Sequence, residues 1–144
     1  KNRWEADKQP KYTIDQLVAE VKKTPTQLVV ITGGEPLMHN LDELTSALQA
    51  AGLETNIETS GAHPLSGHWN WICLSPKKFK EPLPGILPHA NELKVVIFNK
   101  SDFDWAEKYA AQVSPSCKLY LQPEWDKAAQ VTPLIIDYIK AHPQ

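Results

Sequence analysis

The chain has 144 residues, of which 42% are hydrophobic and 22% charged, and its formal net charge is −2. This composition is typical of a soluble globular protein with a sizeable core, and the small net charge excludes a basic field for nucleic acid. No apolar run approaches the roughly 18 residues that span a bilayer. We therefore expect one soluble, cytoplasmic domain over residues 1–144. Because the chain starts at Lys1 without methionine or a signal-peptide pattern, we expect a processed or truncated product.

Helical and strand patterns alternate along the chain. Thr13 and Gln16 match a capping box at the start of one helix, as do Asn40 and Glu43 at the start of the next, and Ser101 can cap a third. In chain order the predicted elements are a helix over 13–23, a strand over 27–31, a helix from 40 to the terminating Gly52, strands over 53–59, 69–74 and 92–98, a helix from 101, a strand over 118–121, and a last helix from Asp126 or Thr132.

The element order αβαβ-ββαβα predicts an α/β fold with a mostly parallel sheet. Between residues 78 and 89 several prolines predict an irregular connection where a βα unit would usually place a helix. Two architectures fit five such strands: an open doubly wound sheet and part of a larger (β/α) barrel.

The end of the first strand carries the most informative turn. Residues 27–31 form a short β-branched run, which we expect to be a buried parallel strand, and residues 32–36 read Thr-Gly-Gly-Glu-Pro. Glycines allow a ligand to approach the backbone closely, while Glu35 supplies a negative charge that suits an ammonium group. Strand, double glycine, carboxylate, proline and helix is the layout of a ligand site at the carboxyl end of an α/β strand.

Three later strands also finish in polar residues. The strand over 53–59 runs into Glu58-Thr59-Ser60-Gly61, the strand over 69–74 into Ser75-Pro76-Lys77, and the strand over 118–121 into Gln122-Pro123. Each ending is weak evidence alone. Their recurrence at the same end of successive strands predicts one shared site at one face of the sheet.

Three carboxylates at strand ends or starts, Glu35, Glu58 and Glu92, need partners where they are shielded from water. Lys77 and Lys94 are the obvious candidates, either within a site or as a structural ion-pair set around a barrel mouth. Cys73 and Cys117, the only cysteines, lie in apolar strand patterns and are expected to be buried, inert thiols. His63 and His68 have a spacing that can bind a metal, although solvated loop histidines are the more common case.

Several common motifs are absent. No Gly-Lys-Ser/Thr follows a glycine run, which excludes a P-loop, and residues 32–35 lack the third glycine of a dinucleotide fingerprint. No Gly-x-Ser-x-Gly elbow is present.

The motifs at 32–36, 58–61, 74–77, 92–94 and 121–123 together resemble, in order, the later motifs of the radical S-adenosylmethionine superfamily. Within it they look most like the 7-carboxy-7-deazaguanine synthase family, and the resemblance covers nearly the whole chain from Tyr12. It implies a partial (β/α) barrel of the radical S-adenosylmethionine type. It also implies a lyase that converts 6-carboxy-5,6,7,8-tetrahydropterin to 7-carboxy-7-deazaguanine on the pathway to queuosine, a modified base of tRNA.

The resemblance also implies roles for individual residues. Gly33, Gly34 and Glu35 would hold the amino group of S-adenosylmethionine, and a second set of residues would contact the rest of the molecule. The implied cofactor-binding residues are Gly33, Gly34, Glu35, Ser75, Pro76, Lys77, Gln122 and Pro123. Thr32 would contact the pterin substrate, and Glu58 and Ser60 would line the same site. The family uses a [4Fe–4S] cluster and Mg²⁺ and is usually homodimeric.

The chain departs from the family pattern where the cluster is bound. The family's Cys-x3-Cys-x2-Cys segment is absent, and two cysteines cannot replace three converging thiolates. We therefore interpret the chain as the central and C-terminal portion of the enzyme, without the cluster-binding segment and the extreme C-terminus, and expect it to be inactive alone. Two alternatives stay open: a non-catalytic α/β nucleoside-binding domain, and another radical enzyme such as a glycyl-radical activase.

Overall fold

A computed structural model of the protein describes residues 10–143. Its helices and strands follow the predicted order. They are α1 (Ile14–Val21), β1 (Leu28–Ile31), α2 (Asp42–Ala50), β2 (Glu54–Thr59), β3 (Trp71–Leu74), β4 (Glu92–Ile97), α3 (Ser101–Ala110), β5 (Lys118–Pro123) and α4 (Ala128–Ala141). Short 3₁₀ turns precede α2, β4 and α4, at η2 (Pro36–Met38), η3 (Pro84–His89) and η4 (Trp125–Lys127).

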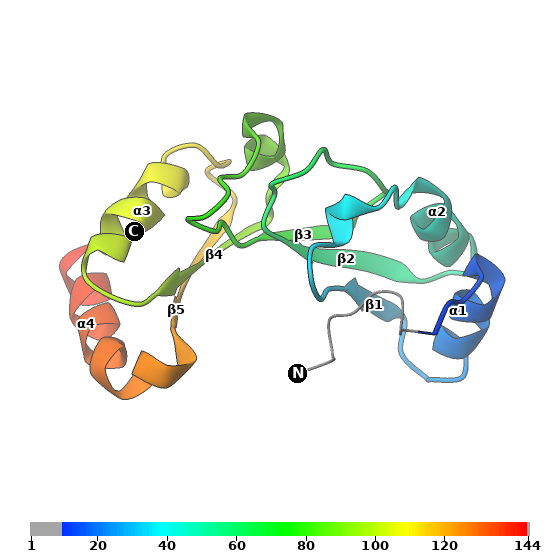
Figure 1. Ribbon diagram of the computed structural model, residues 1–144, viewed down its shortest axis with the longest axis horizontal. Coiled ribbons are helices and arrows are strands. Elements are labelled where there is room, and N and C mark those ends of the chain that lie inside the picture. The colour runs from blue at the N-terminus through cyan, green and yellow to red at the C-terminus, as the bar shows by residue number, and fades with distance from the viewer. Residues whose placement is uncertain (1–9, 144) are drawn as a thin grey trace.

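The five strands form one parallel sheet in the order β1-β2-β3-β4-β5. A doubly wound sheet reverses its strand order at a switch point, whereas a barrel adds each strand beside the previous one. The sequential order therefore confirms the partial barrel. In Figure 1 the strands form an arch, with α1 and α2 beside β1 and β2 and with α3 and α4 beside β4 and β5.

The two faces of the sheet differ in chemistry. Along β4, Leu93, Val95 and Ile97 are buried, and they alternate with the half-buried Lys94 and Val96. The buried residues join the core under the helices. Because side chains alternate across a strand, the opposite face of the sheet receives the polar set. The same alternation on β2 buries its threonines and Ile57 and leaves its carboxylates exposed.

The first strand differs from its prediction as a buried strand. β1 is an edge strand paired only with β2, and Leu28 and Val30 are 43% and 48% exposed. A short β-branched run specifies a strand but not its place in the sheet. Among residues 10–143 no strand pairs with its other edge.

Helix starts were predicted with mixed success. The capping box of Thr13 and Gln16 is confirmed, and Gly52 follows α2 with a φ of +82°. The capping box predicted at Asn40 is wrong, because α2 starts at Asp42 and its N-cap residue is Leu41, which makes no side-chain cap. Asn40 instead accepts a hydrogen bond from the Asp42 amide. Ser101 is also not a cap, but the first residue of α3.

The last helix starts at neither predicted residue. Asp126 lies in η4, and α4 then runs from Ala128 through Thr132. The connection over 78–89 contains no α-helix, as predicted, and its only regular part is η3. This connection matters for the site because it begins at the carboxyl end of β3.

Candidate functional site

The glycine turn after β1 adopts a conformation that only glycine holds without strain. Gly33 and Gly34 have φ angles of +90° and +56°. Apart from the glycine itself and its two chain neighbours, no heavy atom lies within 4 Å of a Cβ built on either residue. The glycines are therefore required by the backbone conformation and not by crowding, and the space beside them is open to a ligand.

Glu35 fixes this turn to the end of β2. Its carboxylate accepts hydrogen bonds from the Thr59 hydroxyl, from the Ser60 amide at 2.8 Å and from the Ser60 hydroxyl. It also accepts from the Leu37 amide at 3.1 Å, which starts η2. Both oxygens are thus engaged within the protein, so the side chain orders the turn while the turn's backbone faces the open space.

The same hydrogen bonds keep Glu35 ionised. Burial works to raise the pKa of Glu35, but the hydrogen bonds from Ser60, Thr59 and the Leu37 amide outweigh it and hold the pKa below the ordinary value of 4.5. The prediction that a lysine would be the partner of Glu35 is therefore wrong. Its charge is stabilised by hydroxyl and amide donors.

A cavity of about 510 Å³ lies beside the turn. Every strand contributes to it at or near its carboxyl end, as the polar strand endings predict. Its wall contains Thr32, Gly33, Gly34, Glu35, Met38, Glu58, Thr59, Ser60, Ala62, His63, Ser75, Lys77, Phe79, Lys80, Lys94, Val96 and Gln122. The volume is within the range of small-molecule sites.

Three lysines, Lys77, Lys80 and Lys94, line the cavity and give it positive charge. Lys94 forms the predicted ion pair with Glu58, with 3.2 Å between Nζ and the carboxylate oxygen. Lys77 instead donates to the Ser75 hydroxyl at 2.8 Å, and no carboxylate of residues 10–143 pairs with it. Burial, reinforced by the charge of Lys94, lowers the pKa of Lys77. An anionic group of a ligand would relieve this unpaired charge.

The two cysteines are buried, as predicted. Cys73 donates to Glu92 at 3.3 Å, and Glu92 also accepts from the Trp71 indole at 3.2 Å. Burial and the hydrogen bond to Glu92 raise the pKa of Cys73 to about 12, and burial raises the pKa of Cys117. Neither thiol is therefore readily available as a thiolate.

These residues do not fit an iron–sulfur cluster or a metal ion. Two cysteines cannot supply three thiolates. In the described part of the chain no three His, Cys, Asp or Glu side chains lie close enough to hold a metal. His63, considered above as a ligand, lies instead with its Nε2 3.1 Å from Nζ of Lys80.

The cavity contains most of the residues predicted from sequence. Thr32, Gly33, Gly34, Glu35, Glu58, Ser60, Ser75, Lys77 and Gln122 all line it. Pro76 lines a smaller neighbouring cavity instead, and Pro123 closes β5 beside Ile97 without lining either. Sequence reasoning missed Thr59 as a partner of Glu35, and it missed His63, Phe79 and Lys80 at the cavity wall.

A second cavity, of about 570 Å³, lies between β5, α3 and α4. Leu93, Val95, Leu119 and Tyr138 contribute to its largely apolar wall. It contains none of the predicted site residues. It is also remote in sequence from the glycine turn, so we place the functional site in the smaller cavity, whose wall contains more charged residues.

The fold is that of an α/β protein with a partial barrel of the radical S-adenosylmethionine type, and a cavity lies at the carboxyl ends of its strands. No protein-family model matches the chain. It is 47% identical to the 7-carboxy-7-deazaguanine synthase of Synechocystis sp., over all of this chain and 69% of the relative. The chain belongs to the 7-carboxy-7-deazaguanine synthase family.

Further relatives agree with this assignment. The 7-carboxy-7-deazaguanine synthase of Flavobacterium psychrophilum is 44% identical over all of this chain and 68% of its own length. The crystal structure of QueE from Escherichia coli has a TM-score of 0.76 and 31% identity, and the match covers 90% of this chain and 60% of that structure. These matches do not favour the binding-domain and activase alternatives.

Proposed function

We propose that the chain carries the S-adenosylmethionine site and part of the substrate site of a 7-carboxy-7-deazaguanine synthase. The parent enzyme would convert 6-carboxy-5,6,7,8-tetrahydropterin to 7-carboxy-7-deazaguanine. One observation supports this most: polar residues that lie in, or directly after, each of the five strands meet in a single cavity beside the glycine turn. In this proposal residues 1–144 form one domain, the central and C-terminal portion of the radical enzyme core.

The cavity suits a ligand with both cationic and anionic groups. The backbone at Gly33, Gly34 and Glu35 would hold the ligand's ammonium, since the carboxylate of Glu35 is already engaged with its own donors. Lys77, whose charge has no partner among the described carboxylates, would receive an anionic group. Ser75, Pro76, Gln122 and Pro123 would complete the contacts with S-adenosylmethionine.

The substrate would bind in the same cavity, beside S-adenosylmethionine. Thr32 would contact the pterin, with Glu58 and Ser60 lining its site. S-adenosylmethionine would supply the radical chemistry in the parent enzyme, where a cluster would be bound outside these residues. The residues of this chain bind and orient the two molecules and exclude water from them.

The finer assignments follow from family membership alone. The [4Fe–4S] cluster and Mg²⁺ are assigned to parts of the parent enzyme outside these 144 residues, because the residues present do not fit either group. A homodimer in the cytoplasm, acting on a small molecule in the pathway to queuosine in tRNA, completes the proposal. No helix in residues 10–143 is long and apolar enough to cross a membrane.

A chimeric enzyme tests the proposal. The segment of the Synechocystis relative that matches this chain is replaced by residues 1–144, and the purified chimera is reconstituted anaerobically with iron and sulfide. We expect it to release 5′-deoxyadenosine and to form 7-carboxy-7-deazaguanine. The 144-residue chain alone is expected to do neither, because it lacks the thiolates for a cluster.

The unmodified relative serves as the positive control, and the chimera carrying Lys77→Met reports on the site. Loss of the Lys77 ammonium should raise KM for S-adenosylmethionine about tenfold, which corresponds to about 1.4 kcal/mol. A chimera that folds and binds about four irons but cleaves no S-adenosylmethionine would contradict the proposal.

A further inference from the structure

Residues 76–79 form a thin wall between two cavities. The proposed ligand cavity lies on one side, and a cavity of about 290 Å³ lies on the other. Lys77 and Phe79 border both. Phe79 is 89% exposed, so its side chain does not anchor the segment in the core. Pro76 is buried, whereas Lys78 and Phe79 are exposed, so packing holds only the start of this wall.

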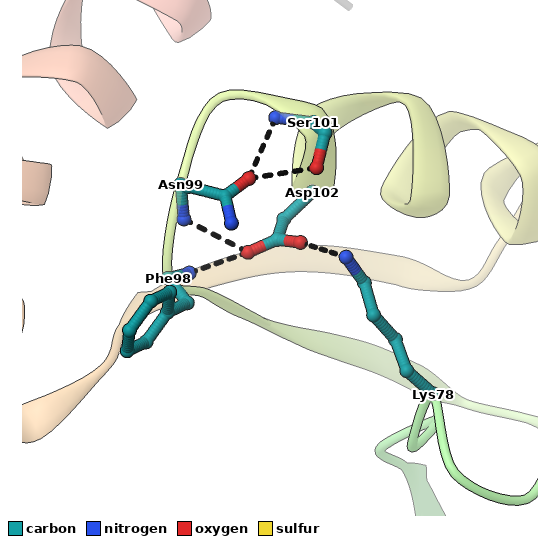
Figure 2. Close-up of polar contacts among 5 residues, drawn as sticks. All are labelled: Lys78, Phe98, Asn99, Ser101 and Asp102. Carbon is teal, nitrogen blue, oxygen red and sulfur yellow. Dashed lines mark hydrogen bonds and ion pairs between the residues drawn. The ribbon is translucent and has the colours of Figure 1, made fainter.

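One ion pair ties the wall to the rest of the fold. Lys78 donates to the carboxylate of Asp102 in the first turn of α3, as Figure 2 shows. Within residues 10–143 this is the only side-chain hydrogen bond or ion pair that joins residues 76–79 to another element. The other polar contacts of the segment are local, namely the Lys77–Ser75 bond and a bridge to Lys80.

Asp102 is itself rigidly held. Its side chain is only 3% exposed. One oxygen accepts from the amides of Phe98 and Asn99 at 2.6 Å and 2.9 Å, and the other accepts from Lys78 (Figure 2). The turn is closed again by Asn99, which accepts from the amide and hydroxyl of Ser101. A buried carboxylate requires such donors, and Lys78 is the cationic one.

We propose that Asp102 is a positioning residue for the ligand cavity: through Lys78 it holds residues 76–79 so that Lys77 stays in the cavity wall. Asp102 lines the neighbouring cavity and does not reach the ligand cavity itself. The identity of the ligand rests on the proposed function, but the tether does not. The residue acts on binding through Lys78 and the backbone between Lys78 and Lys77.

Lys77 itself reports on the tether. Burial and the nearby charge of Lys94 lower its pKa. If the wall is released, the Lys77 ammonium becomes more hydrated, and its pKa should return toward the ordinary value of 10.5. A variant that merely weakens the fold would not change the pKa of one lysine in the folded state.

The first experiment uses the 144-residue chain without ligand. NMR of the lysine Cε–Hε groups follows the titration of Lys77, and amide hydrogen exchange follows residues 77–79. We expect Lys78→Met to raise the Lys77 pKa and to speed exchange of these amides about tenfold, which corresponds to about 1.4 kcal/mol of local stabilisation. Exchange in β4 should be unchanged, and Lys78→Arg should restore the native values.

Lys108→Met is the matched control. It removes another lysine–carboxylate pair on the same connection, Lys108 with Glu81 at 2.8 Å, which does not hold residues 76–79. Asp102→Asn should raise the pKa of Lys77 by the same amount as Lys78→Met. If Asp102→Asn fails to fold, Lys78→Met still decides, because it leaves the bonds of Asp102 to Phe98 and Asn99 in place. An unchanged Lys77 pKa and unchanged exchange in Lys78→Met would overturn the proposal.

The second experiment uses the active chimera. Lys78→Met should raise KM for S-adenosylmethionine about tenfold, since small displacements of a binding group weaken its contacts severely. Lys108→Met should leave KM unchanged. If the chimera carrying the native segment is inactive, the proposed function fails while the NMR result stands. If that chimera is active and the chimera carrying Lys78→Met has the same KM, the ion pair of Lys78 with Asp102 has no role in binding.

Discussion

Two carboxylates, Glu35 and Asp102, hold different parts of the cavity wall by different means. Glu35 joins the turn after β1 to the end of β2 and accepts only from hydroxyls and amides. Asp102 joins α3 to the connection after β3 and accepts from two amides and a lysine. Neutral donors hold the glycine turn at the cavity, whereas residues 76–79 depend on one cation, Lys78. The comparison predicts that the glycine turn is held more firmly than residues 76–79.

The largest effect is expected at Glu35. Glu35→Ala leaves the donors of Leu37, Thr59 and Ser60 without their acceptor, and we expect unfolding to require about 3 kcal/mol less free energy. Urea unfolding monitored by tryptophan fluorescence measures this loss. Glu43→Ala, at an exposed position of α2, is the control and should change stability by less than about 0.5 kcal/mol. A loss below about 1 kcal/mol for Glu35→Ala would contradict its role in ordering the turn.

A smaller loss is expected at Asp102. Asp102→Ala frees the amides of Phe98 and Asn99 and the half-exposed Lys78, and water can replace part of what is lost. We expect about 2 kcal/mol less free energy of unfolding in the same assay. Asp104→Ala, an exposed carboxylate in the same turn of α3, is the matched control. Equal losses for the two variants would show that the buried contacts of Asp102 do not stabilise the fold.

The sequence was sufficient to predict much of the cavity wall but not the hydrogen bonds that hold it. Strand ends are local patterns, and parallel pairing brings them to one edge of the sheet, so Thr32, Ser60, Ser75 and Gln122 could be placed together. The partners of Glu35 could not, because Thr59 and Ser60 are distant in sequence and hydroxyls carry no charge pattern. A lysine was the more obvious partner, and that prediction was wrong.

The same limit applies to the fold. Hydrophobic periodicity was sufficient to predict the types of the elements and their order along the chain. The order of the strands within the sheet could be read only from the strand pairing in the structure. The burial of β1 and the caps at Asn40 and Ser101 were not predictable in the same way. They depend on which strand lies at the edge and on the exact residue where a helix begins, and both are decided by tertiary contacts. The link between Lys78 and Asp102 joins two elements that no local pattern connects.

Acid should remove both supports. Burial works to raise the pKa values of Glu35 and Asp102, but hydrogen bonds hold both below their ordinary values of 4.5 and 3.8. Lowered pKa values mean that these groups stabilise the fold fully above the ordinary values, and that the stabilisation is lost as pH falls through the folded pKa values. Urea unfolding across pH 2–6 should show a shallower acid loss for Glu35→Ala and Asp102→Ala than for the native chain. Parallel curves would contradict the ionised state of these groups.

The smallest effect separates the two carboxylates by salt. The Debye length shortens from about 10 Å at 0.1 M to about 3 Å at 1 M salt, so added salt weakens an ion pair whose lysine is half-exposed. A double-mutant cycle of Lys78→Met and Asp102→Asn should give a coupling free energy of about 1 kcal/mol at low salt that falls by about half at 1 M. The matching cycle of Thr59→Val and Glu35→Gln should be unaffected, because a hydroxyl donates to that carboxylate. Equal salt dependence in the two cycles would remove the distinction between a side of the cavity held by neutral donors and a side held by a cation.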